Sequence, residues 1–196
     1  TLPEGFQQPG QRVLLHLGAV DQLAGVTVNG MLVAYHEGGY LPFAADVTDV
    51  LLPGENHMKV DAVDRLDHDL PYGKQSRTPG GMWYTPVSGI WQSVWMEAVP
   101  QKYIRSIRVT PDLKGIDLLV DSDAPHCEVT VRLAGQEVAR ASYALTDRAQ
   151  RIVIPEEHRR LWTPDDPQLY DLTVRAGEDQ VESYFALRTL SVKTVN

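Results

Sequence analysis

Short runs of alternating apolar and polar residues, separated by turn-forming residues, dominate this chain. In RVLLHLG, Val13, Leu15 and Leu17 alternate with polar neighbours, and in NHMKVDAVD the residues Met58 and Val60 do the same. Successive side chains on a strand point to opposite faces, so a period of two predicts half-buried strands. No stretch has the 3.6-residue period of a long amphipathic helix. The sequence therefore predicts an all-β chain.

The two halves of the chain predict two separate domains. The chain has 196 residues, which allows two cores of modest size. In the first half, Asn29-Gly30 predicts a tight hairpin, because both residues tolerate a positive φ. Glycines and tryptophans are concentrated before Pro100, and this shift in composition predicts a boundary there. We expect domains over residues 1–100 and 101–196.

The second half is typical of an immunoglobulin-like sandwich, which has about seven short strands in about 100 residues. Its strand-like runs are YIRSIRVTPD, GIDLLVDS, CEVTVRLAG, EVARASYAL, QRIVIP, LYDLTVRAG and QVESYFALRTLSV. Only PEEHRRLW, which starts at Pro155, predicts a helical turn, because proline suits the first helical position. Cys127 is the only cysteine, so we expect a buried apolar side chain and no intrachain disulfide.

Composition and charge exclude several classes of function. A formal net charge of −8 argues against a general nucleic-acid binder, because contacts to phosphate need a basic surface. The same charge argues against binding to an anionic membrane surface. No run approaches the about 20 apolar residues that cross a bilayer, and TLPEGFQQPGQ lacks the layout of a signal peptide.

The polar residues show no catalytic set. Asp61, Asp64, Asp67 and Asp69 crowd into DAVDRLDHD, but their spacing does not impose the separation that paired catalytic carboxylates need. A solvated loop is the favoured interpretation, and a cation site is the alternative. No histidine has zinc-ligand spacing, and no serine lies in a nucleophile elbow. His36, before the Gly-rich EGGY, is the histidine with a candidate binding role, although a structural role is favoured. The sequence predicts no metal and no cofactor.

Aromatic residues are concentrated in GGMWYTPVSGIWQSVWMEAVP, which holds three of the four tryptophans. On one continuous strand, Trp91 and Trp95 share a face and Val94 lies on the other. We expect Trp95 to be buried, because burying an aromatic side chain removes about 150–250 Å² from water. Trp83 and Tyr84 lie in a Gly/Pro-rich loop, where packing and a ligand- or interface-facing role are equally compatible with the sequence.

Four ordered motifs resemble the N-terminal sugar-binding domain of family 2 glycoside hydrolases, which include β-galactosidases, β-glucuronidases and β-mannosidases. The motifs are LHLGAVDQLAGVTVNG, HEGGYLPFAADVTDVL, PGENHMKVDAVD and SGIWQSVWMEAV. The second half, with LWTPDDPQLYDLTV and VESYFALRTLSV, is similar to the immunoglobulin-like domain that follows it. The resemblance covers nearly the whole chain. It implies a jelly-roll β-sandwich, here expected to lack its first strands, and then an immunoglobulin-like β-sandwich. Open strand edges on an incomplete jelly roll make a homo-oligomer possible.

The resemblance also implies a function. In these enzymes a (β/α)₈ barrel follows and holds both catalytic glutamates. The chain is then expected to be a non-catalytic N-terminal fragment of a cytoplasmic or exported bacterial glycosidase. It would support and edge the active site of the missing barrel, and carbohydrate would bind through the parent enzyme. A free-standing carbohydrate-binding module and a structural pair of sandwiches without a ligand are the alternatives.

The loop before SGIW carries the expected substrate contacts. In galactosidases and glucuronidases this loop usually offers an acidic residue six positions before the glycine of that motif. Here Trp83 stands six positions before Gly89, so the usual contact to a sugar hydroxyl is in doubt. The residues of this loop that are expected to face substrate are Lys74, Gln75, Trp83 and Tyr84. His36, outside the loop, is the fifth expected contact.

Overall fold

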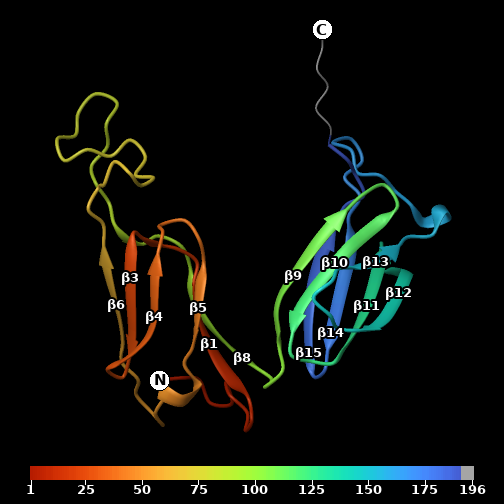
Figure 1. Cartoon of the computed structure of the whole chain (residues 1–196), viewed down its shortest axis with the longest axis horizontal. Coiled ribbons are helices and arrows are strands. Elements are labelled where there is room, and N and C mark those ends of the chain that lie inside the picture. The colour runs from red at the N-terminus through yellow and green to blue at the C-terminus, as the bar shows by residue number, and fades with distance from the viewer. Residues whose placement is uncertain (191–196) are drawn as a thin grey trace. The chain divides into compact units, whose positions relative to one another are not determined.

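The computed structural model describes residues 1–190 and contains two compact units. The first unit runs from Thr1 to Val99, and the second begins at Pro100 (Figure 1). The regular elements of residues 1–190 are strands and two single turns of 3₁₀ helix, which confirms the all-β prediction. Within this part of the chain, no helix has the length and apolar character needed to cross a membrane.

The first unit is a sandwich of two three-stranded sheets with an added two-stranded ribbon. One sheet has the strand order β5-β1-β8, the other has the order β4-β3-β6, and β2 pairs with β7. The elements are β1 (Arg12–Leu17), β2 (Val20–Asp21), β3 (Leu23–Val28), β4 (Met31–Glu37), β5 (Phe43–Asp46), η1 (Thr48–Val50), β6 (Met58–Val63), β7 (Gly89–Ile90) and β8 (Val94–Val99).

The core of the first unit follows the predicted alternation. Val13 and Leu17 are fully buried on β1, and Leu15 between them is 1% exposed. The predicted hairpin joins β3 to β4, with φ values of 49° at Asn29 and 83° at Gly30. These left-handed values are the ones that a type I′ turn needs at both central positions.

The sandwich core is partly open along the edge strands β6 and β8. Met58 on β6 pairs with the buried Val28, and Val94 on β8 pairs with the buried Leu17, so both face inward. Nevertheless, Met58 is 50% exposed and Val94 is 37% exposed. Apolar side chains of the inner faces therefore meet solvent beside two strands that each pair on one side only within the described part of the chain.

The tryptophan-rich run differs from the prediction of one continuous strand. It forms β7 and β8, and the segment from Trp91 to Ser93 between them is not a strand. The register places Val94 and Met96 opposite core residues of β1, so Trp95 points outward and stacks on His16, with ring centroids 4.8 Å apart. Trp95 is 47% exposed, and the expectation that it is buried is therefore wrong.

The second unit pairs a three-stranded sheet with a four-stranded sheet, as in an immunoglobulin-like sandwich. The sheet orders are β13-β10-β9 and β12-β11-β14-β15. Each of the seven predicted runs overlaps one of these strands, and three of the strands begin one residue earlier than the run; the last residues of the final run lie outside the described part. The elements are β9 (Ile104–Pro111), β10 (Gly115–Ser122), β11 (His126–Leu133), β12 (Gln136–Ala144), β13 (Gln150–Val153), η2 (Glu156–His158), β14 (Tyr170–Ala176) and β15 (Asp179–Phe185).

A buried tyrosine anchors the connection that precedes β14. Tyr170 is fully buried, and its hydroxyl donates to the carbonyl of His158 at 2.8 Å and accepts the amide N–H of Arg160 at 2.6 Å. The helical turn predicted from Pro155 is the single 3₁₀ turn η2. Cys127 is 1% exposed, as predicted, and burial raises the pKa of its thiol.

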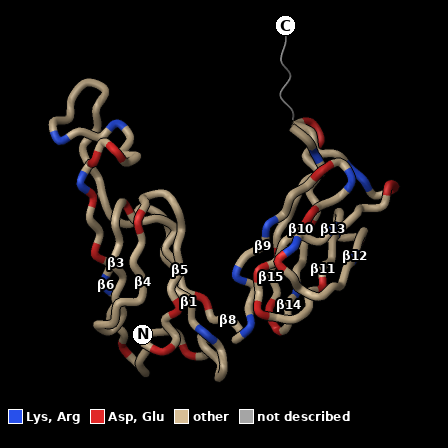
Figure 2. Tube along the Cα trace, in the orientation of Figure 1, with Lys and Arg blue, Asp and Glu red and all other residues tan. Residues whose placement is uncertain are grey.

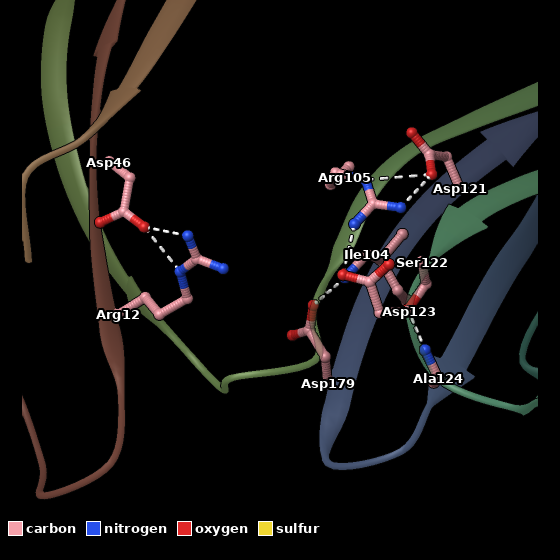
Figure 3. A network of polar contacts seen from close by, with 9 residues as sticks. All are labelled: Arg12, Asp46, Ile104, Arg105, Asp121, Ser122, Asp123, Ala124 and Asp179. Carbon is pink, nitrogen blue, oxygen red and sulfur yellow. Dashed lines mark hydrogen bonds and ion pairs between the residues drawn. The ribbon is translucent and has the colours of Figure 1, made fainter. Parts of the chain in front are cut away.

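Ion pairs fix the start of β9. The guanidinium of Arg105 contacts Asp121 at 2.5 Å and Asp123 at 2.7 Å, and Asp179 accepts the amide N–H of Ile104 at 2.7 Å (Figure 3). Exposed ion pairs of this kind contribute about 0–1 kcal/mol each, so they add little to the stability of the fold. Figure 3 also shows the pair between Arg12 and Asp46 in the first unit.

Candidate functional site

The long loop between β6 and β7, residues 64–88, extends beyond the ends of the strands of the first unit (Figure 1). Its charged residues all lie between Asp64 and Arg77, with the three aspartates before Lys74 and Arg77 (Figure 2). Backbone hydrogen bonds hold two of its segments together. The amide of Tyr84 donates to the carbonyl of Lys74 at 2.7 Å, and the amide of Ser76 donates to the carbonyl of Tyr84 at 3.0 Å. The loop therefore has a defined framework without a full strand pair.

Gln75 connects two further points of this loop. Its Nε2 donates to the carbonyl of Tyr72 at 2.8 Å, and its Oε1 accepts the amide N–H of Val87 at 2.6 Å. Both ends of the side-chain amide are therefore used inside the loop. In this structure Gln75 holds the loop in shape, and a contact between its side chain and substrate stays a prediction.

Residues of the loop line an open cavity of about 510 Å³, which we call the loop cavity. Its lining residues are Leu66, His68, Tyr72, Gln75, Ser76, Arg77 and Trp83. The imidazole Nδ1 of His68 lies 3.0 Å from the hydroxyl of Tyr72. Aromatic rings beside a few polar groups are typical of small-ligand sites, because the rings cover apolar surface and the polar groups fix orientation.

The aspartates of this loop make turns. Asp64 accepts the amide N–H of Leu66 at 2.9 Å, and Asp67 accepts the amide N–H of Asp69 at 3.2 Å. Aspartate commonly closes turns in this way. Among residues 1–190, no group of three or more His, Cys, Asp or Glu side chains is placed to hold a metal ion. Two of these aspartates therefore shape turns of the loop.

Four of the five predicted substrate-facing residues meet in the loop. Gln75 and Trp83 line the loop cavity, and Lys74 and Tyr84 are joined by the backbone hydrogen bond described above. His36 lies on a different element, β4, where its ring stacks on Phe43 with centroids 4.3 Å apart. Its Nε2 is buried and has no hydrogen-bond partner among residues 1–190.

Sequence reasoning missed His68, Tyr72 and Arg77 as lining residues of the loop cavity. His68 and Tyr72 are four residues apart on either side of Pro71, within HDLPY. A proline between two aromatic side chains in a polar loop indicates a turn, and a turn can bring such side chains together. That signal was available in the sequence, but it does not show which other residues the turn faces.

A second cavity of about 430 Å³, which we call the ribbon cavity, lies at the β2–β7 ribbon. Its lining residues are Asp21, Tyr40, Gln75, Val87, Ser88, Gly89, Ile90 and Trp91. Asp21 pairs with Gly89 across the ribbon, and Gly89 has a φ of 97°, a value that favours glycine. Burial raises the pKa of the Asp21 carboxyl, and the nearby negative charge of Asp64 raises it further.

Comparisons with known proteins agree with this fold. Residues 102–188 match the family described as "Glycosyl hydrolases family 2". A β-galactosidase from Thermoanaerobacter pseudethanolicus is 27% identical over 95% of this chain and 26% of its own length. A β-glucuronidase from Paenibacillus borealis is 28% identical over 95% of this chain and 34% of its own length.

Solved structures give the same result. A β-glucuronidase from Faecalibacterium prausnitzii is 30% identical, with a TM-score of 0.70, over 94% of this chain and 35% of its own. A β-glucuronidase from Ruminococcus gnavus shares the fold with a TM-score of 0.78 at 21% identity, over 98% of this chain and 35% of its own. The chain therefore spans about a quarter to a third of the length of these relatives. It corresponds to the N-terminal portion of family 2 glycosyl hydrolases of the β-glucuronidase and β-galactosidase type, with a first β-sandwich and an immunoglobulin-like second one.

Proposed function

We propose that this chain is the non-catalytic N-terminal region of an enzyme that hydrolyses β-glycosidic bonds. The supporting observation is its similarity to β-glucuronidases and a β-galactosidase over 94–95% of this chain but only 26–35% of theirs. In such an enzyme two carboxylates about 5–5.5 Å apart break the bond with retention of configuration. Those two groups belong to a catalytic domain outside these residues, and the present chain supports that domain and edges its active site.

Residues 64–88 are the part that we assign to the edge of the active site. Trp83 is 45% exposed and Tyr84 is 67% exposed, so both rings are available to another surface. A pyranose has an apolar C–H face that packs well on an aromatic ring. Because Trp83 stands where an acidic residue was expected, this loop offers the sugar an apolar contact there in place of a charge. Lys74 is exposed and suits a substrate that carries a carboxylate, such as a glucuronide.

Steady-state kinetics of the longer enzyme test the proposal. We expect Trp83→Ala to lower kcat/KM for 4-nitrophenyl β-glycosides at least about tenfold, the typical loss when a well-packed contact made in the transition state is removed. Tyr184→Ala on β15 is the matched control for Tyr84→Ala, because Tyr184 is 68% exposed and the same ring is removed. If Trp83→Ala and Tyr84→Ala both stay within twofold of the unchanged enzyme, the loop does not edge the active site.

The same assay decides between the two sugar classes. Lys74→Gln removes a positive charge and keeps a side chain of similar length. If the parent enzyme takes glucuronides, the change lowers kcat/KM for the 4-nitrophenyl β-D-glucuronide and leaves that for the β-D-galactoside nearly unchanged. Equal effects on both substrates would contradict a contact between Lys74 and a sugar carboxylate.

A further inference from the structure

The edge strand β6 of the first unit offers a surface for another strand. Among residues 1–190 it pairs with β3 alone, so the side that faces away from β3 has no neighbouring strand. We propose that β6 pairs with β6 of a second copy of this chain, antiparallel and centred on Val60, and that this pairing joins two sheets into one. The contact does not depend on the role proposed above for residues 64–88.

Alternate backbone groups of β6 point to its open side. The amide of Asn29 donates to the carbonyl of His57 at 2.8 Å, so the backbone groups of His57 face β3. Successive residues of an antiparallel strand direct their N–H and C=O groups to opposite sides, and the register of β6 with β3 has no shift. The backbone groups of Met58, Val60 and Ala62 therefore point away from β3. A row of such groups is a template for a further strand.

The charges of β6 are complementary to themselves. Lys59 and Asp61 are exposed and lie on either side of Val60, on the outer face of the sheet. In an antiparallel pair centred on Val60, Lys59 of each copy lies opposite Asp61 of the other. These are non-hydrogen-bonded positions, where opposed side chains come closest. Within one copy the Nζ of Lys59 lies 2.8 Å from the carboxylate of Asp61, so the pairing gives each charge a second opposite neighbour.

The same two charges select the register and the strand. A pair centred on Lys59 or on Asp61 places like charges directly opposite each other, which is destabilising. The other open edge, β8, carries Glu97 as its single charged side chain, so it cannot form an ion pair with itself. The charge pattern therefore favours β6, centred on Val60, as the contact between copies.

The inner face of β6 gains cover from the same pairing. Met58 is 50% exposed although it lies opposite the buried Val28, and Val60 and Ala62 pack against the core. In the proposed pair Met58 of each copy lies opposite Ala62 of the other, so a large side chain meets a small one. Removing this apolar surface from water stabilises the contact. Because the same strand is used on both copies, the contact closes with two chains and predicts a dimer.

Sedimentation velocity of the 196-residue chain, from micromolar to submillimolar concentration, tests the proposal. In 150 mM NaCl the Debye length is about 8 Å, which screens the net charge of −8 on each copy more than it screens the close pairs. We expect a monomer–dimer equilibrium. Lys59→Glu should weaken the dimer at least about tenfold, because two attractions become two repulsions. Adding Asp61→Lys should restore the dimer, since the strand is then complementary to itself again. Lys114→Glu is the matched control, because Lys114 is exposed in the second unit and the net charge changes equally.

Amide hydrogen exchange followed by NMR locates the contact on the chain. The amides of Met58, Val60 and Ala62 gain acceptors in the dimer, so their exchange should slow about tenfold when about nine-tenths of the chain is dimeric. The proposal is overturned if the chain stays monomeric at submillimolar concentration, or if Lys59→Glu dimerises as tightly as Lys114→Glu. It is also overturned if adding Asp61→Lys fails to restore the dimer, or if exchange at these three amides is the same at low and high concentration. None of these outcomes bears on the kinetic test of the loop.

Discussion

Replacing Gln75 by alanine should loosen the long loop without unfolding the sandwich beneath it. The substitution removes two hydrogen bonds, one to the carbonyl of Tyr72 at 2.8 Å and one from the amide of Val87 at 2.6 Å. Each such bond contributes about 1 kcal/mol net, so the free energy of local opening should fall by about 2 kcal/mol. Since about 1.4 kcal/mol corresponds to a factor of ten, the amide of Val87 should exchange with solvent about 30 times faster.

Amide hydrogen exchange followed by NMR measures this change residue by residue. Gln75→Glu keeps an oxygen that can accept from Val87 but loses the donor to Tyr72, so we expect a smaller increase, about fivefold. Lys74→Ala is the matched control, because it changes the neighbouring exposed side chain, and exchange at Val87 should stay within twofold. An exchange rate at Val87 that is also within twofold in Gln75→Ala would refute the role of Gln75 as the residue that holds the loop in shape.

Three further predictions concern the two cores and the charged surface. Tyr170→Phe should lower the free energy of unfolding of the second unit by about 2 kcal/mol, because the buried hydroxyl makes two hydrogen bonds. Urea titration followed by ¹⁹F NMR of 5-fluorotryptophan at Trp162 measures this free energy. Leu15→Ala should cost the first unit about 3 kcal/mol in the same assay at Trp91, because Leu15 is 1% exposed in the core. Hydrogen bonds from Arg151 and from backbone amides lower the pKa of Asp112 to about 2, from an ordinary value of 3.8. The carboxylate therefore stabilises the second unit above about pH 4, and this contribution is lost as the pH falls toward 2. Arg151→Gln should flatten that part of the curve of unfolding free energy against pH.

The strands were predictable because their signal is local. Val13, Leu15 and Leu17 alternate with polar residues, and a period of two has one simple structural meaning. Asn29-Gly30 is equally local, because the turn type depends on the φ values that these two residues tolerate. The run that contains Trp95 was harder, since its inward and outward faces are both apolar. Only pairing with β1 decides that Val94 and Met96 face the core and that Trp95 does not.

The candidate sites were less predictable because they depend on contacts between distant segments. The family resemblance predicts substrate contacts in the loop before SGIW. Lys74, Gln75, Trp83 and Tyr84 do meet in that loop. The part played by Gln75 within the loop depends on Val87, twelve residues away, and no sequence pattern indicates that pairing. The ribbon cavity was even less predictable from the sequence. Asp21 and Trp91 are seventy residues apart, and the pairing of β2 with β7 brings them together.

Turnover of 4-nitrophenyl β-D-glucuronide and β-D-galactoside by the purified 196 residues tests the central claim most directly. The claim is that these two sandwiches support and edge an active site whose bond-breaking carboxylates lie on another domain. We predict no hydrolysis above the uncatalysed rate by the 196 residues alone, and hydrolysis of at least one substrate by the longer enzyme. The claim would be contradicted if the 196 residues alone hydrolysed a substrate and a single Asp→Asn change at Asp64, Asp67 or Asp69 abolished that activity. The catalytic group would then lie within this chain.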